Sequence, residues 1–170
     1  MNRDYNISQV FGTLYRAASD LELKVPTAPQ QLFGPGAVYD FFKALSDVIT
    51  SAKSALLIID PYMDDQIFDA YLSKVPHGIP IRLLVGKPAA SLKTGVEKYA
   101  QQYQTSIEVR RTNSIHDRLL FVDGQVCWVL GQSIKDAAST KPTYLAPLAP
   151  DLVVTKLQEY EKLWHQASAI

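Results

Sequence analysis

Apolar residues recur with helical spacing in four stretches of the chain, which are numbered 7–15, 38–49, 92–103 and 152–164. In the first stretch the apolar residues are Ile7, Val10, Phe11, Leu14 and Tyr15. Residues three or four positions apart share one side of a helix, so each stretch predicts an amphipathic helix. The acidic pair Asp64-Asp65 suits the first turn of another, shorter helix that ends near Tyr71.

Five shorter apolar runs predict strands, and they are numbered 55–59, 79–85, 106–109, 115–122 and 125–130. The first run is continuously apolar, as expected of a strand that is buried on both faces. Asp123-Gly124 separates the last two runs and predicts a hairpin turn. Residues 138–150 contain three prolines, and we expect them to form a loop.

Strands that alternate with helices and then give way to a hairpin predict an α/β fold with a mixed sheet. Helices should cover both faces of that sheet. The Pro/Gly-rich stretch that ends at Gly36 divides the chain into two parts. Residues 1–36 are an N-terminal amphipathic helix with a linker, and residues 37–170 are the main domain.

The composition is that of an ordinary globular protein, with 47% hydrophobic and 20% charged residues. Lys and Arg together number 17, as do Asp and Glu, so attraction to phosphate must be local. We expect Cys127, the single cysteine, to be a buried packing residue. The sequence shows no leader-like start and no membrane span, so a cytoplasmic location is the default expectation. It also contains no metal-binding or nucleotide-binding motif, and we expect neither metal nor cofactor.

The stretch from His116 to Asp123 carries the candidate chemistry. Strict alternation along a strand places His116 and Arg118 on the same face and Asp117 on the opposite one. An imidazole can act as a nucleophile or a base at a phosphodiester, and a guanidinium can hold phosphoryl oxygens. Arg110-Arg111 is either part of this local basic cluster or a solvated strand end.

His116-x-Arg118-x-x-x-x-Asp123, followed by the turn Gly131-Gln132-Ser133, resembles the HxKxxxxD…GSxN signature of the phospholipase D superfamily. Arginine stands where that signature has lysine. The residues of the motif are most similar to those of small, mostly bacterial phospholipase D-like domains, whose sequence is HDRFLIID…GxSxKD. Asp60-Pro61-Tyr62 after an apolar run also resembles these domains. The resemblance covers roughly residues 37–140.

The resemblance implies a role for each motif residue. His116 would be the nucleophile that forms a phosphohistidine intermediate, and Arg118 would clamp the phosphoryl oxygens. Asp123 either orients the motif or is simply a good turn residue. Ser133 either supplies a hydroxyl to the phosphate or is an ordinary loop serine. Lys135 and Arg111 complete the predicted phosphate-binding set, and no metal takes part.

Two features depart from the family pattern. Residues 131–138 contain no asparagine, and residues 140–146 contain no carboxylate that could hydrogen-bond the imidazole. Asp136 or Asp117 could substitute, although alternation turns Asp117 away from His116. Asp60, Asp64 and Asp65 could form a metal cluster, but a strand end and a helix start explain them better.

The motif occurs once, whereas phospholipase D-type chemistry uses two histidines across one phosphate. We therefore expect a homodimer that brings two copies of His116 together. The predicted activity is metal-independent hydrolysis of phosphodiesters, with nucleic acid preferred over phospholipid. The alternative is a catalytically inactive module that binds phosphate groups, lipid headgroups or a protein partner. The helix predicted at 7–15 either adds to the dimer surface or docks a protein partner.

Overall fold

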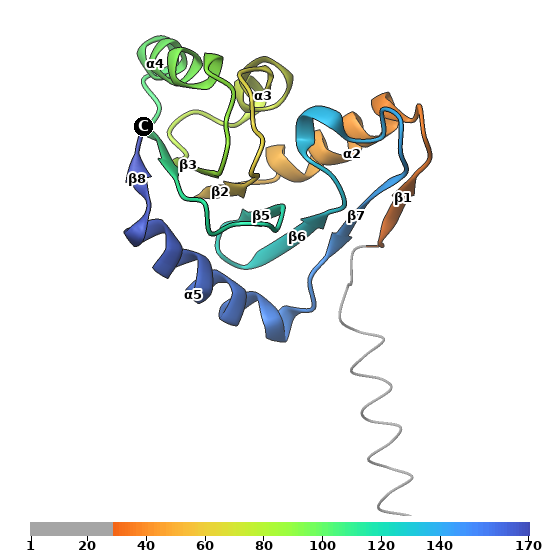
Figure 1. Ribbon diagram of the computed structural model, residues 1–170. Helices are drawn as coiled ribbons and strands as arrows, with labels where there is room; N and C mark the ends of the chain where they lie inside the picture. Colours follow the sequence, from red (N-terminus) through yellow and green to blue (C-terminus); the bar gives the residue numbers. More distant parts are fainter. Residues whose placement is uncertain (1–28) are drawn as a thin grey trace, which may run out of the picture.

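The computed structural model describes residues 29–170, which form one eight-stranded mixed sheet with helices on both faces (Figure 1). The strands are β1 (Gln31–Phe33), β2 (Leu56–Ile59), β3 (Ile81–Val85), β4 (Ile107–Arg111), β5 (Leu119–Val122), β6 (Val126–Leu130), β7 (Thr143–Pro147) and β8 (Ser168–Ala169). The helices are α2 (Val38–Thr50), α3 (Gln66–Ala70), α4 (Ser91–Tyr103) and α5 (Pro150–Gln166), with short 3-10 turns η1 (Leu72–Lys74) and η2 (Ile134–Asp136). The α/β prediction is confirmed.

The strands lie in the order β1-β7-β6-β5-β2-β3-β4-β8. β2, β3 and β4 are parallel, whereas β5 runs antiparallel to β2 and β6 runs antiparallel to β5. The carboxyl ends of β2, β3, β4 and β6 therefore meet the start of β5 at one edge of the sheet. We call this the motif edge, because the His116 segment leads into β5 there.

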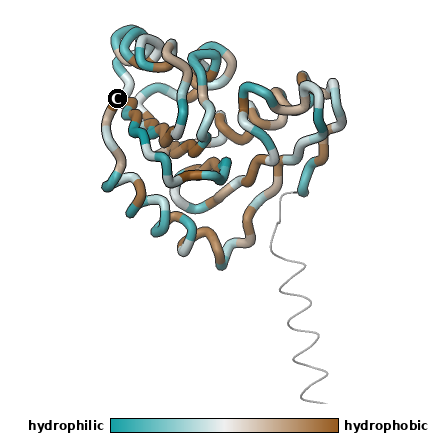
Figure 2. Tube along the Cα trace, viewed as in Figure 1, coloured by the Kyte–Doolittle hydropathy of each residue, from teal (hydrophilic) through white to brown (hydrophobic). Residues whose placement is uncertain are grey.

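Two hydrophobic cores lie on opposite faces of the sheet, and they explain why helices cover both faces. Helices α2, α3 and α4 pack on one face, where Leu45, Phe68 and Leu83 are buried together. Helix α5 covers the other face, where Tyr160 and Trp164 pack against β-strand residues. Brown, apolar positions accordingly gather along the central strands in Figure 2. Successive residues of β2 serve different cores, with Ile58 in the first and Ile59 in the second, as strand alternation requires.

The predicted helices at 38–49, 92–103 and 152–164 are confirmed as α2, α4 and α5, and the short helix is confirmed as α3. The hairpin turn is also confirmed, because Asp123 and Gly124 have φ values of 55° and 66° at the centre of a turn in which the Gln125 amide donates to the Val122 carbonyl at 3.1 Å. Residues 123–125 connect Val122 to its strand partner Val126. Cys127 is fully buried in the α5-side core, where burial raises the pKa of its thiol to about 12.

Three strands lie where the sequence predicted none. β1 falls inside the stretch assigned to the linker, and it pairs antiparallel with β7, which falls inside the predicted loop 138–150. Both are short and flanked by proline, so their local patterns resemble those of loops; β8 is only two residues long. The helix predicted at 7–15 lies outside the described residues.

The strand predicted from Ile115 to Val122 is shorter than expected, because β5 begins at Leu119. Leu119 pairs with Ile59 on one side and Val129 on the other, and β2 ends at that pair. The segment before Leu119 therefore has no neighbour in the sheet on the β2 side. His116 and Arg118 precede the strand and lie at the motif edge.

Candidate active site

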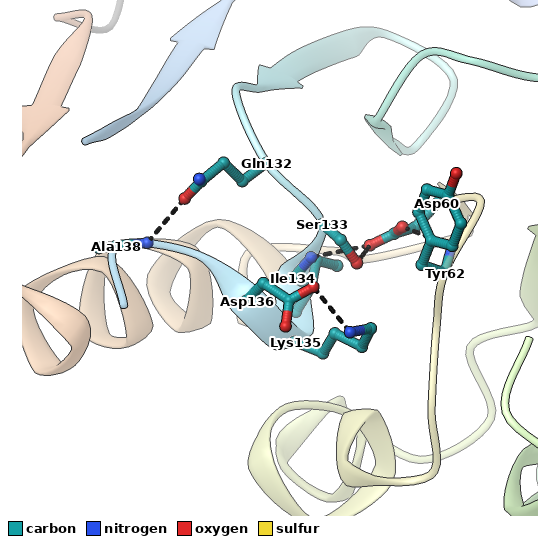
Figure 3. A network of polar contacts seen from close by, with 8 residues as sticks. All are labelled: Asp60, Tyr62, Gln132, Ser133, Ile134, Lys135, Asp136 and Ala138. Carbon is teal, nitrogen blue, oxygen red and sulfur yellow. Dashed lines mark hydrogen bonds and ion pairs between the residues drawn. The ribbon is translucent and has the colours of Figure 1, made fainter. Parts of the chain in front are cut away.

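Asp60 is the buried polar centre of the motif edge. It follows β2 directly, and none of its surface is exposed. Its Oδ2 accepts hydrogen bonds from the Ser133 hydroxyl at 2.9 Å and the Ile134 amide at 2.8 Å, and its Oδ1 accepts one from the Tyr62 amide at 3.0 Å. Figure 3 shows Ser133 and Ile134 converging on this carboxylate. Asp60 thereby fixes the turn after β6 against the end of β2.

Burial raises the pKa of Asp60 above its ordinary value, although its hydrogen bonds and nearby Arg118 act in the lowering direction. Asp60 lies two positions after Ile58, and Arg118 lies two positions before Leu120, so each shares a face of the sheet with that neighbour. Ile58 and Leu120 both belong to the core under α2, α3 and α4. The carboxylate and the guanidinium therefore lie on the same face of the sheet. Arg118 is half-buried, and its Nε has no hydrogen-bond partner in residues 29–170.

His116 is exposed, and its side chain makes no hydrogen bond within the described part of the chain. Asp117 beside it faces the other way, as alternation predicted. Its Oδ2 accepts hydrogen bonds from Tyr160 at 2.9 Å and from Lys156 at 3.1 Å, both on α5. Partial burial acts in the opposite direction, but these bonds leave the pKa of Asp117 below its ordinary value. Asp117 thus anchors the motif segment to α5.

Asp123 lies at the other end of β5, away from His116. Its Oδ1 accepts hydrogen bonds from the backbone amides of Lys53, Ser54 and Ala55 at 2.7–3.0 Å and from the Ser54 hydroxyl. Backbone amides of Ser54 and Ala55 are the main cause of a pKa of about 2 for this carboxyl. This geometry suits the orienting role and separates Asp123 from the phosphate-binding set.

The remaining predicted phosphate-binding residues lie at the motif edge. Ser133 is buried beside Asp60, while Lys135 is exposed and forms a 2.7 Å ion pair with Asp136. Arg111 ends β4, and its Nε donates to the Gly86 carbonyl at 3.1 Å. The structure therefore brings His116, Arg118, Ser133, Lys135 and Arg111 to one edge.

Arg110 does not join that set. Its guanidinium pairs with Glu108 at 2.6 Å, donates to the Trp164 carbonyl at 3.0 Å and lies over the Trp164 ring. These contacts hold the end of α5 against β4. The two neighbouring arginines therefore have different surroundings.

The sequence reasoning missed two features of the motif edge. Asp60 was assigned to a strand end only, although its burial and its three partners make it the centre of the site. Lys87 follows β3 at the same edge, where its amide donates to the Pro61 carbonyl at 2.6 Å. A polar residue one or two positions after each parallel strand was the available signal. Asp64 accepts a hydrogen bond from the Gln66 amide at the start of α3, and Asp65 accepts one from the Ser91 hydroxyl. Within residues 29–170 no three ligand-type side chains gather as a metal site.

No family model and no curated protein matches the sequence. Solved structures do match. Nuc, a phospholipase D family member from Salmonella typhimurium, is 15% identical with a TM-score of 0.64, and the match covers 84% of this chain and 97% of Nuc. NucT from Helicobacter pylori is 16% identical with a TM-score of 0.61, over 84% of this chain and 99% of NucT.

The chain has the phospholipase D fold. TrmBL2, an archaeal chromatin protein described as showing a novel mode of DNA binding, is similar at 14% identity with a TM-score of 0.57. That match covers 98% of this chain and 66% of TrmBL2. No helix among the described residues is long and apolar enough to cross a membrane.

Proposed function

We propose that the protein is a metal-independent phosphodiesterase, and specifically a nuclease. The observation that carries this proposal is the motif edge, where exposed His116 precedes half-buried Arg118 above buried Asp60. An imidazole open to substrate beside a fixed guanidinium matches the needs of phosphoryl transfer. The phospholipase D fold, with Nuc and NucT among its similar structures, supports the same chemistry.

In the proposed reaction an imidazole nitrogen of His116 attacks phosphorus while Arg118 holds the non-bridging oxygens. The bond from phosphorus to the leaving oxygen breaks, and that oxygen takes a proton from a second, protonated imidazole. Water then attacks phosphorus, and the second imidazole accepts the proton of that water. The nitrogen–phosphorus bond breaks and restores His116.

The second imidazole would come from a second copy of the chain, because the printed sequence carries the motif once. A twofold dimer that brings two motif edges together would place both imidazoles at one phosphate. The exposure of His116 at an edge of the sheet is compatible with such an approach.

Hydrolysis of single-stranded DNA, RNA and bis(p-nitrophenyl) phosphate in EDTA tests the activity. We expect the wild-type chain to cleave at least one of these, and His116→Ala to lose turnover by roughly 10³ or more. His165→Ala, which removes another exposed histidine on α5, is the matched control and should retain activity. Equal cleavage by His116→Ala and wild type would reject the assignment.

Subunit mixing tests the composite site. Light scattering at micromolar concentration should give about twice the 18.9 kDa mass of one chain. After equal amounts of wild type and His116→Ala exchange subunits, only about one quarter of the dimers contain two intact histidines, so activity should be about a quarter of that of wild type at the same total concentration. A strict monomer, or a mixture that keeps one half of that wild-type activity, would contradict the shared site.

A second candidate is a non-catalytic phosphate-binding module. The specific observation in its favour is that no carboxylate of residues 29–170 forms a hydrogen bond with the His116 ring. TrmBL2, described as DNA-binding, shares the fold. This candidate predicts that Arg118→Ala weakens nucleic-acid binding, that His116→Ala leaves it unchanged, and that neither wild type nor variant shows turnover.

A further inference from the structure

A groove of about 380 Å³ opens between α2, α3 and η2, on the face of the sheet that also holds Asp60 and Arg118. Its volume lies within the range of roughly 300–1,000 Å³ that is usual for small-molecule sites. Its lining is mainly apolar and aromatic, and it includes Tyr39, Phe42, Ile67, Tyr71, Ile134 and Lys135.

Three aromatic rings form one wall of this groove. Tyr39 and Phe42 have centroids 6.1 Å apart, and Phe42 and Tyr71 have centroids 5.3 Å apart. Tyr71 is buried and Phe42 is half-buried, but 71% of Tyr39 is exposed. Packing therefore accounts for the inner rings, while Tyr39 presents a large aromatic surface that the described core does not use.

Other lining residues of the groove belong to the motif edge. Ile134 lines the groove, and its amide donates to Asp60 at 2.8 Å. Lys135 follows in the same short turn, and Met63 and Asp64 extend the lining from the end of β2. Figure 3 shows this turn, with Lys135 on it, next to the Asp60 network. One rigid element therefore joins the groove to the proposed phosphate site.

We propose that this groove binds one base of a single-stranded nucleic acid whose neighbouring phosphate lies at the motif edge. A base has flat apolar faces, which suit the exposed ring of Tyr39, and a polar rim, which suits Gln66 and Asp64 in the groove lining. Lys135, which is exposed and paired with Asp136, lies where the backbone would pass from the groove to Arg118, and a phosphate there would exchange with that carboxylate. This inference rests on the proposed function and assigns its substrate class.

The alternative occupant is an acyl chain of a phospholipid, and the lining favours the base. An acyl chain offers no hydrogen bond to the side-chain amide of Gln66, whereas the polar rim of a base can exchange hydrogen bonds with it. A duplex keeps its bases stacked inside, which leaves none free to enter the groove. Single strands are therefore the expected ligand.

Paired ligands test the groove separately from the phosphate site. Fluorescence anisotropy would measure the binding of a labelled oligothymidylate and of an oligomer of equal length with tetrahydrofuran spacers in place of nucleosides. We expect Tyr39→Ala to weaken oligothymidylate binding by roughly 5-fold to 100-fold and to leave the abasic oligomer unchanged. Tyr39→Phe, which keeps the ring, should bind both as wild type does.

Leu32→Ala is the matched control, because Leu32 is 78% exposed on β1 and does not line the groove. It should change neither affinity. An unchanged oligothymidylate affinity in Tyr39→Ala, or equal losses for both oligomers, would overturn the inference. So would Tyr39-dependent binding of phosphatidylglycerol vesicles in place of the oligonucleotide.

Cleavage of the same two oligomers separates failure of this inference from failure of the proposed function. If the groove assignment alone is wrong, wild type and Tyr39→Ala cleave oligothymidylate equally. If the nuclease proposal is wrong, wild type cleaves neither oligomer, and the difference in base-dependent binding between wild type and Tyr39→Ala still decides the groove.

Discussion

Asp60 and Asp123 end the two antiparallel strands β2 and β5, so they lie at opposite edges of the same strand pair. Asp60 is fully buried, and burial raises its pKa. Asp123 is partly exposed, and backbone amides of Ser54 and Ala55 lower its pKa to about 2. The two residues belong to one chemical type, but burial dominates at one edge and hydrogen bonding dominates at the other.

Under the proposed function, this difference gives one end of the motif a role in the chemistry and the other end a role in folding. At the Asp123 end, backbone amides of the loop before β2 donate hydrogen bonds to the charged carboxylate, so ionisation of Asp123 stabilises the fold. At the Asp60 end ionisation is opposed by burial, and the charged neighbour is Arg118 of the proposed site. Charged groups that are not fully compensated often mark functional sites.

Among the tests of the comparison between the Asp60 end and the Asp123 end, the largest change in turnover is expected on substitution of Arg118. If its guanidinium clamps the phosphoryl group, Arg118→Ala should lower turnover by roughly 10² or more and leave folding stability nearly unchanged. Arg118→Lys should be milder, because it keeps a cation but loses the bidentate fork. Steady-state kinetics and denaturant unfolding provide the measurements.

Arg110→Ala is the matched control for that experiment, because Arg110 contacts Glu108 and Trp164 instead of the motif edge. It should leave turnover unchanged and cost about 1 kcal/mol or less of stability. Unfolding of Arg118→Ala would instead give Arg118 a role in the architecture.

An intermediate effect is expected from neutralising each carboxylate. Asp123→Asn should lower the free energy of unfolding by about 1–2 kcal/mol, because charge-assisted bonds to the backbone are lost, and should leave turnover of the folded enzyme unchanged. Asp60→Asn should cost at least as much stability, because the NH2 group of the new side chain would face the Tyr62 or the Ile134 backbone amide in a fully buried site and leave a donor without an acceptor. It should lower turnover about tenfold, because the Ser133 turn and Arg118 lose their charged partner. Equal behaviour of the two variants would contradict the division into two ends.

The smallest effect is the pH dependence of stability. The pKa of Asp123 falls from 3.8 to about 2 on folding, so its contribution is present above pH 3.8 and is lost as the pH falls from 3.8 to about 2. Unfolding measured across this window should show a steep acid limb in wild type that flattens in Asp123→Asn.

Asp60 should act in the opposite direction, because its pKa rises on folding. The folded state then binds more protons, and stability declines as the pH increases from 3.8 through the raised pKa. Asp60→Asn should remove that decline. An acid limb that keeps its slope in Asp123→Asn would show that other carboxylates set it.

Periodicity predicted the long elements because each of them buries one continuous face. Helices α2, α4 and α5 and the central strands β2 and β3 carry enough apolar residues for the pattern to be read without a partner. The spacing of His116, Arg118 and Asp123, with the glycine turn after it, also led to the phospholipase D resemblance and to the fold. These conclusions follow from local sequence.

Strands β1, β7 and β8 were not predictable in this way. Each is short, and its backbone is satisfied by a strand distant in sequence, as when Gln31 pairs with Leu145. The start of β5 at Leu119 was likewise set by β2, which stops at Ile59. The residues of one strand do not determine where the strand that pairs with it ends.

By itself, the sequence of this protein determined the α/β class, the alternation that turns Asp117 away from Arg118, and the motif that names the candidate chemistry. Only the tertiary structure decided that Asp60 is buried between Ser133 and Arg118 and that Asp123 stands apart from them. It also decided that a groove with Tyr39 on its wall adjoins the motif edge. Burial and long-range hydrogen bonds set the ionisation of a side chain and its contact partners. Burial and these hydrogen bonds depend on segments that come together only in the folded protein.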